Sequence, residues 1–524
     1  MTTSTDPQLY PQYVLVTADP KATNTPFQPE KPTELVFLTQ TSSPTAALPV
    51  LIDTPIVSVT PSPNPTLVIV ESVTPFGTEV PTILPVDTST PLPHPDMVDL
   101  PTHSMSVLMD YPGHVVTVNE TIIYPNISPD QLASIALAVN PNLWSGVFSL
   151  QTLEVNGQTA NNYNLGGQWL TVSLDTPLLP GNAIKIGITY QLTLPFSSAK
   201  FENFGYTSRQ TNLIDWYPYV PPYQNGQWVL PDPYMYGENL VYDKANFQVT
   251  LTFSEPANAP VVAASSTAIN DNGSLVYNLS NARNFTISAS PDYLISTADA
   301  NGVTIFNYYF PSNSNAAAMV LELTRMSVNT YSTEFGPYPH NSLTVCETDL
   351  NDGLETDGLY FLASSFYQSF DGSVKNNLST IAIHETAHQW WYGAVGNNQA
   401  VEPWLDEALA TYSEHVFYED NYPDLINWWW NFRVDSHAPS GWVDSRVYDT
   451  GSFRAYVNAV YFNGAHFLQA LRDRIGDQAY FDFLRDYYTR NNGRIASSYD
   501  FFAILDLHSS TDISDIISTY FYYR

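Results

Sequence analysis

The sequence predicts a multidomain protein: an extended Pro/Thr-rich N-terminal arm, then an antiparallel β domain, then an α+β domain. Three patterns support this order. Prolines and threonines crowd the first 100 residues, period-two alternation of apolar residues follows, and helical spacing dominates after about residue 290. A chain of 524 residues is also long enough for several domains. We place the three segments at residues 1–101, 102–288 and 289–524.

The arm has a composition that cannot support a hydrophobic core. Residues 1–100 hold 18 of the 40 prolines and 18 threonines, with Gly77 as the only glycine. One interpretation is a stiff, extended spacer. Short β-branched runs at 13–16, 35–38, 49–52, 56–59 and 67–70 support another interpretation, an arm that adds strands to the sheet of a neighbouring copy. Self-assembly through the arm therefore stays open.

The middle segment shows the marks of an antiparallel β domain. Alternating runs at 106–109, 115–118, 121–124, 170–173 and 184–188 predict successive strands, and Gly-containing dipeptides such as Asn156-Gly157 and Asn272-Gly273 predict turns between them. An aromatic and proline-rich run at 215–223 is either a rigid packed loop or a platform for a ligand.

The last segment combines a few strands with long helices. Strands at 303–310 and 342–346 flank a helix at 316–335. Apolar residues at i, i+3 and i+4 predict further helices at 373–392, 403–419, 456–475, 478–490 and 498–508.

Charge and cysteine content exclude several classes of protein. The chain has 18 Lys and Arg against 51 Asp and Glu, a net charge of −33, which repels nucleic acid and anionic lipid. Cys346 is the only cysteine, so no intrachain disulfide forms. There is no apolar run of about 18 residues, so we expect no membrane span. The acidic, Lys-poor composition is typical of an exported protein, so we expect a secreted or cell-surface location, although the given chain shows no signal peptide.

The strongest functional signal is the segment His384-Glu385-Thr386-Ala387-His388, which matches H-E-x-x-H on a predicted helix. Spacing of four residues places both imidazoles on one helical face, where they can bind one cation. Zinc in catalytic sites takes three protein ligands and leaves a position for water.

A third ligand follows at a suitable distance. After eighteen intervening residues comes Glu407, at the start of the next predicted helix. Two antiparallel helices can bring Glu407 to the two imidazoles, which predicts a zinc site of His384, His388 and Glu407. Glu385 is then free to accept a proton from water and pass it to a leaving nitrogen.

These residues resemble the M1 family of gluzincin aminopeptidases, whose signature is H-E-x-x-H, eighteen residues and Glu. The segment Trp404-Leu405-Asp406-Glu407-Ala408-Leu409-Ala410 is similar to the family's W-L-N-E-G-F-A, with Asp406 and Ala408 as departures. The resemblance implies a saddle-like β-sandwich domain, a thermolysin-like catalytic domain and a zinc cofactor. It also implies a short form, because the family's large helical C-terminal domain has no counterpart.

The resemblance implies roles for three more residues. The segment 353–359 looks like the family's G-A-M-E-N-x-G-L element, in which Glu355 corresponds to the carboxylate that binds the substrate amine and Gly353 lies on the strand that contacts the peptide. Tyr461 matches the oxyanion tyrosine of Y-x-K-G-A-x-x-L, with Asn463 in place of Lys; Tyr456 is the alternative.

The function expected from these residues is that of a zinc aminopeptidase acting on peptides, with Glu385 as base and Tyr461 as oxyanion donor. Two alternatives remain at this level. One is an endopeptidase, favoured if Thr356 and Asp357 spoil amine binding. The other is a structural or assembly protein, a surface layer or filament, that carries a peptidase-like body and joins through its arm.

Overall fold

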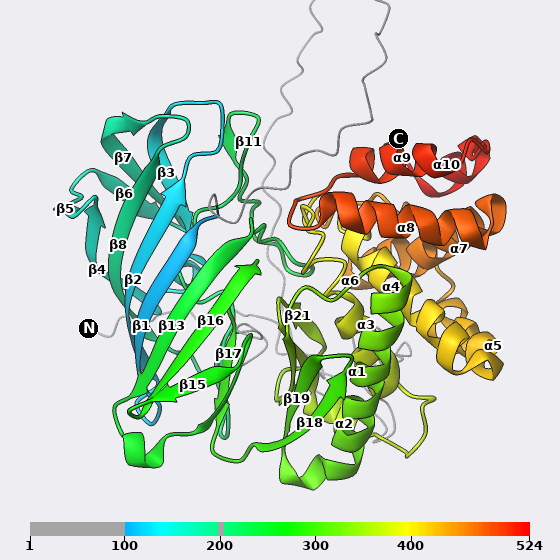
Figure 1. The fold of residues 1–524 in the computed structure, drawn as a ribbon, viewed down its shortest axis with the longest axis horizontal. Coiled ribbons are helices and arrows are strands. Elements are labelled where there is room, and N and C mark those ends of the chain that lie inside the picture. Colours follow the sequence, from blue (N-terminus) through cyan, green and yellow to red (C-terminus); the bar gives the residue numbers. More distant parts are fainter. Residues whose placement is uncertain (1–99, 198–203, 524) are drawn as a thin grey trace, which may run out of the picture. The chain divides into compact units, whose positions relative to one another are not determined.

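The structure is a computed structural model that describes residues 100–197 and 204–523 (Figure 1). The described residues belong to one of the two units of the chain, and the other unit, residues 31–91, lies outside them. The predictions for the Pro/Thr-rich arm and its strand-like runs likewise fall outside the described residues and stay predictions.

The β domain is built on a large sheet whose strands alternate buried and exposed residues. In β1, for instance, every second side chain from His103 to Met109 is buried, so period-two alternation gives the sheet one core face. The strand order is β15 (Ala268–Asp271), β16 (Ser274–Ala282), β13 (Ala245–Phe253), β1 (Thr102–Asp110), β2 (Val115–Pro125), β8 (Ala183–Thr193), β4 (Phe148–Val155) and β5 (Gln158–Thr159).

Two details of the β prediction were wrong. The sheet is not antiparallel throughout, because β1 and β13 run parallel, with Thr102 opposite Asn246 and Met109 opposite Phe253. The runs at 115–118 and 121–124 are one strand, β2, because residues 119 and 120 continue the ladder to β1 and β8.

Smaller sheets complete the β domain, and their inner faces share one apolar core with the large sheet. The aromatic and proline-rich run is part of this core, since Trp216 is fully buried and its indole N–H donates to the Phe285 carbonyl. The run therefore packs as a rigid loop at Trp216, while Asp215 at its start lines a cavity. These sheets are β3 (Leu132–Ala138), β7 (Trp169–Leu178) and β6 (Tyr163–Gly166); β14 (Val261–Ala264), β17 (Ile287–Ser290), β10 (Thr211–Leu213) and β9 (Gly205–Tyr206); and β11 (Tyr223–Gln224) with β12 (Gln227–Trp228).

The α+β domain begins with a sheet and α1 (Ser314–Glu334). Figure 1 shows α1 beside β18 and β19, and the buried face of α1 joins the apolar core of this domain. The strand order is β18 (Leu294–Ala300), β19 (Val303–Tyr309), β20 (Ser342–Thr348), β22 (Leu359–Ala363) and β21 (Leu354–Thr356). Because β21 ends this order and pairs only with β22 among the described strands, its other edge is available to an extended chain.

Helices make up the rest of the domain. The helix predicted at 373–392 is shorter, because the Asn376 side chain accepts from the Ser379 N–H and caps α3. The chain leaves the helix near His388. The remaining helices are α2 (Ser364–Gln368), α3 (Asn377–Ala387), α4 (Trp404–Asn421), α5 (Ile426–Trp429), α6 (Phe453–Val457), α7 (Asn463–Ile475), α8 (Asp477–Asn491), α9 (Ser498–His508) and α10 (Ser514–Tyr520).

A buried ion cluster joins the two domains next to β21. Asp357 accepts from Lys244 Nζ at 2.9 Å and from the Arg283 backbone N–H at 2.8 Å, and pairs with His340 Nε2 at 2.6 Å. Burial alone raises the pKa of Asp357, but the Lys244 and His340 charges outweigh it and hold that pKa far below its usual range. The turn that follows β21 is thereby fixed against the β domain. None of the described helices combines the length and apolar character needed to cross a membrane.

Candidate active site

Helices α3 and α4 bring three metal-binding side chains to one point. His384 and His388 come from the end of α3 and Glu407 from the first turn of α4, and all three are buried. The two Nε2 atoms are 3.1 Å apart, and Glu407 Oε2 lies 3.3 Å from His384 Nε2 and 3.5 Å from His388 Nε2. The three ligand atoms predicted from the sequence thus form a compact triangle.

The triangle has the dimensions of a zinc site. Zinc binds nitrogen and oxygen at about 2.0–2.1 Å in a tetrahedron, whose edges are then about 3.3–3.4 Å. The three measured separations, 3.1, 3.3 and 3.5 Å, lie around that value. Burial raises the pKa of Glu407, but the neighbouring imidazoles outweigh it and hold the pKa at about 2, so Glu407 is an anionic ligand. Two imidazoles and a carboxylate are a donor set that zinc prefers.

A second group of side chains fixes the orientation of the imidazoles. His384 Nδ1 lies 2.9 Å from Glu414 Oε1, and His388 Nδ1 lies 3.0 Å from the Trp391 carbonyl oxygen. Because each Nδ1 faces an acceptor, the proton of each neutral ring sits on Nδ1 and Nε2 keeps its lone pair for a metal.

Glu414 is itself held by a buried network that the sequence reasoning missed. Arg433 donates to it through Nε at 2.8 Å and Nη2 at 2.7 Å, and the Trp429 indole N–H donates at 3.0 Å. Burial raises the pKa of Glu414, but Arg433 and the hydrogen bond from His384 outweigh this, so the pKa lies below its usual value. Glu414 follows Glu407 by seven residues, so helical periodicity places the two on one face of α4; that spacing is the signal from which it could have been found.

Glu385 lies on α3 beside the metal ligands and lines the cavity into which they open. Its pKa is well above the usual value because of burial and the charges of Glu355 and Glu407. Gly353 packs directly against it. A methyl group at Gly353 would overlap the Glu385 carboxylate, so the absence of a side chain at residue 353 leaves room for that carboxylate.

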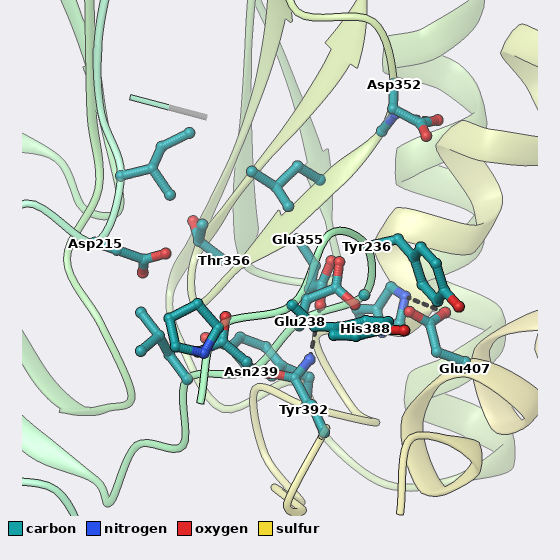
Figure 2. A pocket seen from close by; sticks show the side chains of 18 of the residues that line it. Asp215, Tyr236, Glu238, Asn239, Asp352, Glu355, Thr356, His388, Tyr392 and Glu407 are labelled. Carbon is teal, nitrogen blue, oxygen red and sulfur yellow. Dashed lines mark hydrogen bonds and ion pairs between the residues drawn. The ribbon is translucent and has the colours of Figure 1, made fainter. Parts of the chain in front are cut away.

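Two further carboxylates, those of Glu355 and Glu238, lie close to the metal ligand Glu407. Glu355 lies on β21, where Gln399 Nε2 donates to its Oε1 at 3.0 Å. Glu238 comes from the loop before β13 and was not predicted, because no spacing in the sequence marks it. One carboxylate oxygen each of Glu238, Glu355 and Glu407 lies within 4.8 Å of the others (Figure 2). Burial and the charges of Glu355 and Glu407 raise the pKa of Glu238 well above its usual value. The group can therefore accept a cation.

Tyr461 is the tyrosine that reaches the site. It lies on a π-helical turn, Asn458–Phe462, and its ring stacks on His384 with centroids 6.0 Å apart and an interplanar angle of 11°. π-Helical turns are frequent at functional sites. Tyr461 lines the cavity, whereas Tyr456, the alternative, is fully buried and is not among the residues that line it.

The site opens into a cavity of about 780 Å³ that has walls from both domains. β21 borders it, so a peptide in the cavity can pair with the strand edge while its first bond lies near the triangle. The seven residues predicted for the site, His384, Glu385, His388, Glu407, Tyr461, Glu355 and Gly353, all line this cavity.

Comparison with known proteins agrees with this geometry. Residues 320–520 match the model of the peptidase family M1 domain. This part of the chain is similar to an M1 peptidase domain. It includes the metal-binding triangle, β21, Glu385 and Tyr461, so the resemblance noted from the sequence is confirmed, and zinc is the cofactor that the family implies.

Relatives by sequence are named as aminopeptidases. Aminopeptidase M1-C from Oryza sativa is 26% identical over 240 residues, which covers 43% of this chain and 27% of the rice protein. Human aminopeptidase O is 26% identical over 204 residues, 32% of this chain and 24% of the human protein. The match thus spans about a quarter of the length of each relative.

Solved structures share the fold over most of the chain. The M1 zinc metallopeptidase from Deinococcus radiodurans superposes with a TM-score of 0.58 at 20% identity, covering 80% of this chain and 92% of that one. A mutant of the same enzyme bound to a Tyr-Ser-Ala substrate gives a TM-score of 0.57 at 20% identity, with coverage of 80% and 94%. The multidomain architecture predicted from the sequence, a β-rich domain followed by a catalytic domain, is therefore confirmed outside the arm.

Proposed function

We propose that this protein is a zinc-dependent aminopeptidase that removes the first residue of peptides. The observation that carries the proposal is the buried triangle of His384, His388 and Glu407, which opens into a cavity beside Glu385, Glu355 and a free strand edge. The aminopeptidase relatives and the M1 peptidase domain support the same reaction.

The metal centre and Glu385 would together activate the attacking water and the scissile bond. Zinc, when held by His384, His388 and Glu407, supplies Lewis acidity that polarises the scissile carbonyl and lowers the pKa of water. Glu385 accepts the proton of the attacking water and passes it to the leaving nitrogen. A carboxylate that lies beside the attacking water can take part in both transfers, first as base and then as acid.

The oxyanion and the peptide are held by other side chains. Tyr461, whose ring stacks on His384, places a phenol at the metal-binding triangle, where its O–H donates to the oxygen that gains charge in the transition state. Burial keeps this phenol protonated, because it raises the pKa of Tyr461 well above 10. β21 aligns the peptide backbone.

Glu355 and Glu238 bind the substrate ammonium and so set cleavage at the first peptide bond. The endopeptidase alternative depended on Thr356 and Asp357 disturbing the binding of the substrate amine. Neither residue does so. The Thr356 hydroxyl donates to the Leu359 carbonyl oxygen at 2.6 Å, and the Asp357 carboxylate is occupied by Lys244 and His340. Neither group competes for the amine, which supports exopeptidase over endopeptidase activity.

A pair of matched peptides tests this proposal. The protein, with zinc bound, is given the same pentapeptide with a free and with an acetylated N-terminus, and products are identified by mass spectrometry. We expect release of the first residue from the free peptide and none from the acetylated one. Equal cleavage of both would establish an endopeptidase, and cleavage of neither would refute peptidase activity.

The place of action is also a proposal. We infer that the protein works outside the cytoplasm, as its acidic, Lys-poor composition suggests. A secreted or cell-surface location is tested by fractionation of the source cells with an antibody against the catalytic domain.

A further inference from the structure

The cavity beyond the metal centre has an unusual charge. The described residues that line it include six carboxylates and no lysine or arginine. Three of these acids surround the metal-binding triangle and one is a ligand, so their roles are covered by the proposed reaction. The carboxylates are Asp215, Glu238, Asp352, Glu355, Glu385 and Glu407.

Two acids remain. Asp352 acts on Glu385, whose pKa its charge raises, whereas Asp215 lies at the far end of the cavity from Glu407. In Figure 2 it lies at one end of the cavity and Glu407 at the other, with Glu355 and Tyr392 between them. The Tyr392 phenol is affected by the charges of both Asp215 and Glu355. Burial raises its pKa first, and the charges of Asp215 and Glu355 raise it further, so both carboxylates act on the same phenol. Because Tyr392 lies between Glu355 and Asp215 in Figure 2, a side chain that starts at the amine-binding end can extend past Tyr392 toward Asp215.

The Asp215 carboxylate is built into the wall. The Tyr242 hydroxyl donates to its Oδ1, while Oδ2 has no hydrogen-bond partner among the described residues. Asp215 also has φ of 51°, in the left-handed region, which is rare for a residue other than glycine and is often found at functional sites. Tyr392, on the same path, has φ of 139°. One oxygen of Asp215 is thus held in place, and the other is left for a ligand.

Other residues of the cavity that contains Asp215 also favour a cation. Trp144 and Phe204 line the same cavity and stack with centroids 6.3 Å apart and an interplanar angle of 8°. Aromatic faces attract ammonium and guanidinium groups, and a carboxylate adds a charge-assisted hydrogen bond. An acidic side chain would instead be repelled by the Asp215 carboxylate.

We propose that Asp215 selects peptides whose first residue is arginine or lysine. The inference rests on the proposed aminopeptidase function and adds its substrate class. Glu355 and Glu238 hold the α-ammonium, and the long basic side chain extends along the cavity until its charged end reaches Asp215 Oδ2. Shorter or neutral side chains leave that oxygen without a partner.

The test compares two substrates that have almost the same shape. Arginine and citrulline differ in that the citrulline end group is neutral, so kcat/KM for fluorogenic Arg and citrulline amides isolates the charge. A hydrogen bond between charged groups corresponds to a preference of about 10- to 100-fold, and we expect that ratio for the wild-type protein. In Asp215→Asn we expect the ratio to fall to about 1.

The variants are matched. Asparagine keeps an acceptor for Tyr242 and tolerates a positive φ better than most residues, so Asp215→Asn preserves the local fold. Asp271→Asn, an exposed acid on β15 that does not line the cavity, removes the same charge elsewhere and is expected to keep the wild-type ratio. Unchanged thermal unfolding confirms that both variants fold.

Each outcome decides the proposal. An Arg-to-citrulline ratio near 1 in wild type, with turnover of both, would overturn the substrate class and leave the aminopeptidase proposal standing. A high ratio that persists in Asp215→Asn would overturn the assignment to Asp215. Release of dipeptides from basic peptides would overturn the register, since Asp215 would then bind the α-ammonium. Absence of turnover for every free-amine substrate would refute the proposed function itself, and this proposal with it.

Discussion

The substitution Glu414→Gln separates the role of the buried network behind the metal site from that of the ligands. Every partner of Glu414 is a donor: Oε1 faces His384 Nδ1 and Arg433 Nη2, and Oε2 faces the Trp429 indole N–H and Arg433 Nε. A glutamine has one oxygen and one NH₂ group. In either orientation its NH₂ meets an N–H of Arg433, so the network cannot be satisfied.

The size of the effect follows from burial. Breaking a buried ion pair by removing one charge costs about 3–5 kcal/mol, because the partner charge stays buried. At about 2–4 °C per kcal/mol for a domain of roughly 235 residues, the Tm of the metal-free protein falls by about 6–20 °C. Loss of the acceptor for His384 Nδ1 also weakens zinc binding by about 10- to 100-fold.

The assay measures both quantities against a control on the same helix. Thermal unfolding in excess chelator gives the change in Tm, and competition with a chromophoric chelator gives the zinc Kd. Glu419 also binds an arginine, Arg472, at 2.7 Å, but its side chain is 41% exposed. Glu419→Gln is therefore expected to cost under about 1 kcal/mol and to leave the zinc Kd unchanged. A Glu414→Gln protein with the same Tm and Kd as this control would refute the reasoning.

Three further predictions use other measurements. Tyr461→Phe lowers kcat by about 10²- to 10³-fold with little change in KM, as for a donor used in the transition state, while Tyr456→Phe keeps most of kcat; the reverse pattern in steady-state kinetics would assign the oxyanion to Tyr456. The Arg-to-citrulline ratio of kcat/KM rises with pH through about 6, because burial raises the pKa of Asp215 to about 6 and only the ionised carboxylate attracts the cation. The groups packed against it, Tyr217, Tyr219, Tyr242 and Tyr392, have pKa values well above 10 and stay neutral there, so a ratio independent of pH from 5 to 7 would contradict the assignment. Deletion of residues 1–99 converts a high-mass assembly into monomers that keep peptidase activity, as size-exclusion chromatography measures; a monomeric full-length chain would leave the spacer interpretation of the arm.

Sequence periodicity predicted the strands and helices whose own residues repeat at the spacing of that element. Long strands such as β1 and β8 alternate buried and exposed residues, and α8 and α9 repeat apolar residues at helical spacing. Periodicity did not predict the parallel pairing of β1 with β13, because the two strands lie more than 130 residues apart in the sequence and only packing of the domain brings them together.

The residues of the site also divide into those that a local sequence pattern marks and those that only the tertiary fold brings in. His384, His388 and Glu407 were predictable because their spacing on two helices is itself the geometry of the site. Glu238 and Arg433 were not, because each reaches the site from a segment whose position depends on tertiary folding. Tyr461 could be ranked above Tyr456 only by its motif, and the ring stacked on His384 supplies the physical reason.

The most direct test of the central claim is the zinc content and activity of Glu385→Gln beside wild type. If His384, His388 and Glu407 hold the metal and Glu385 only moves protons, the variant binds one zinc per chain, as measured by plasma emission spectrometry, and its kcat on free-amine peptides falls by about 10³-fold or more. A Glu385→Gln protein that keeps wild-type kcat, or a wild-type protein that is active without zinc, would contradict the account.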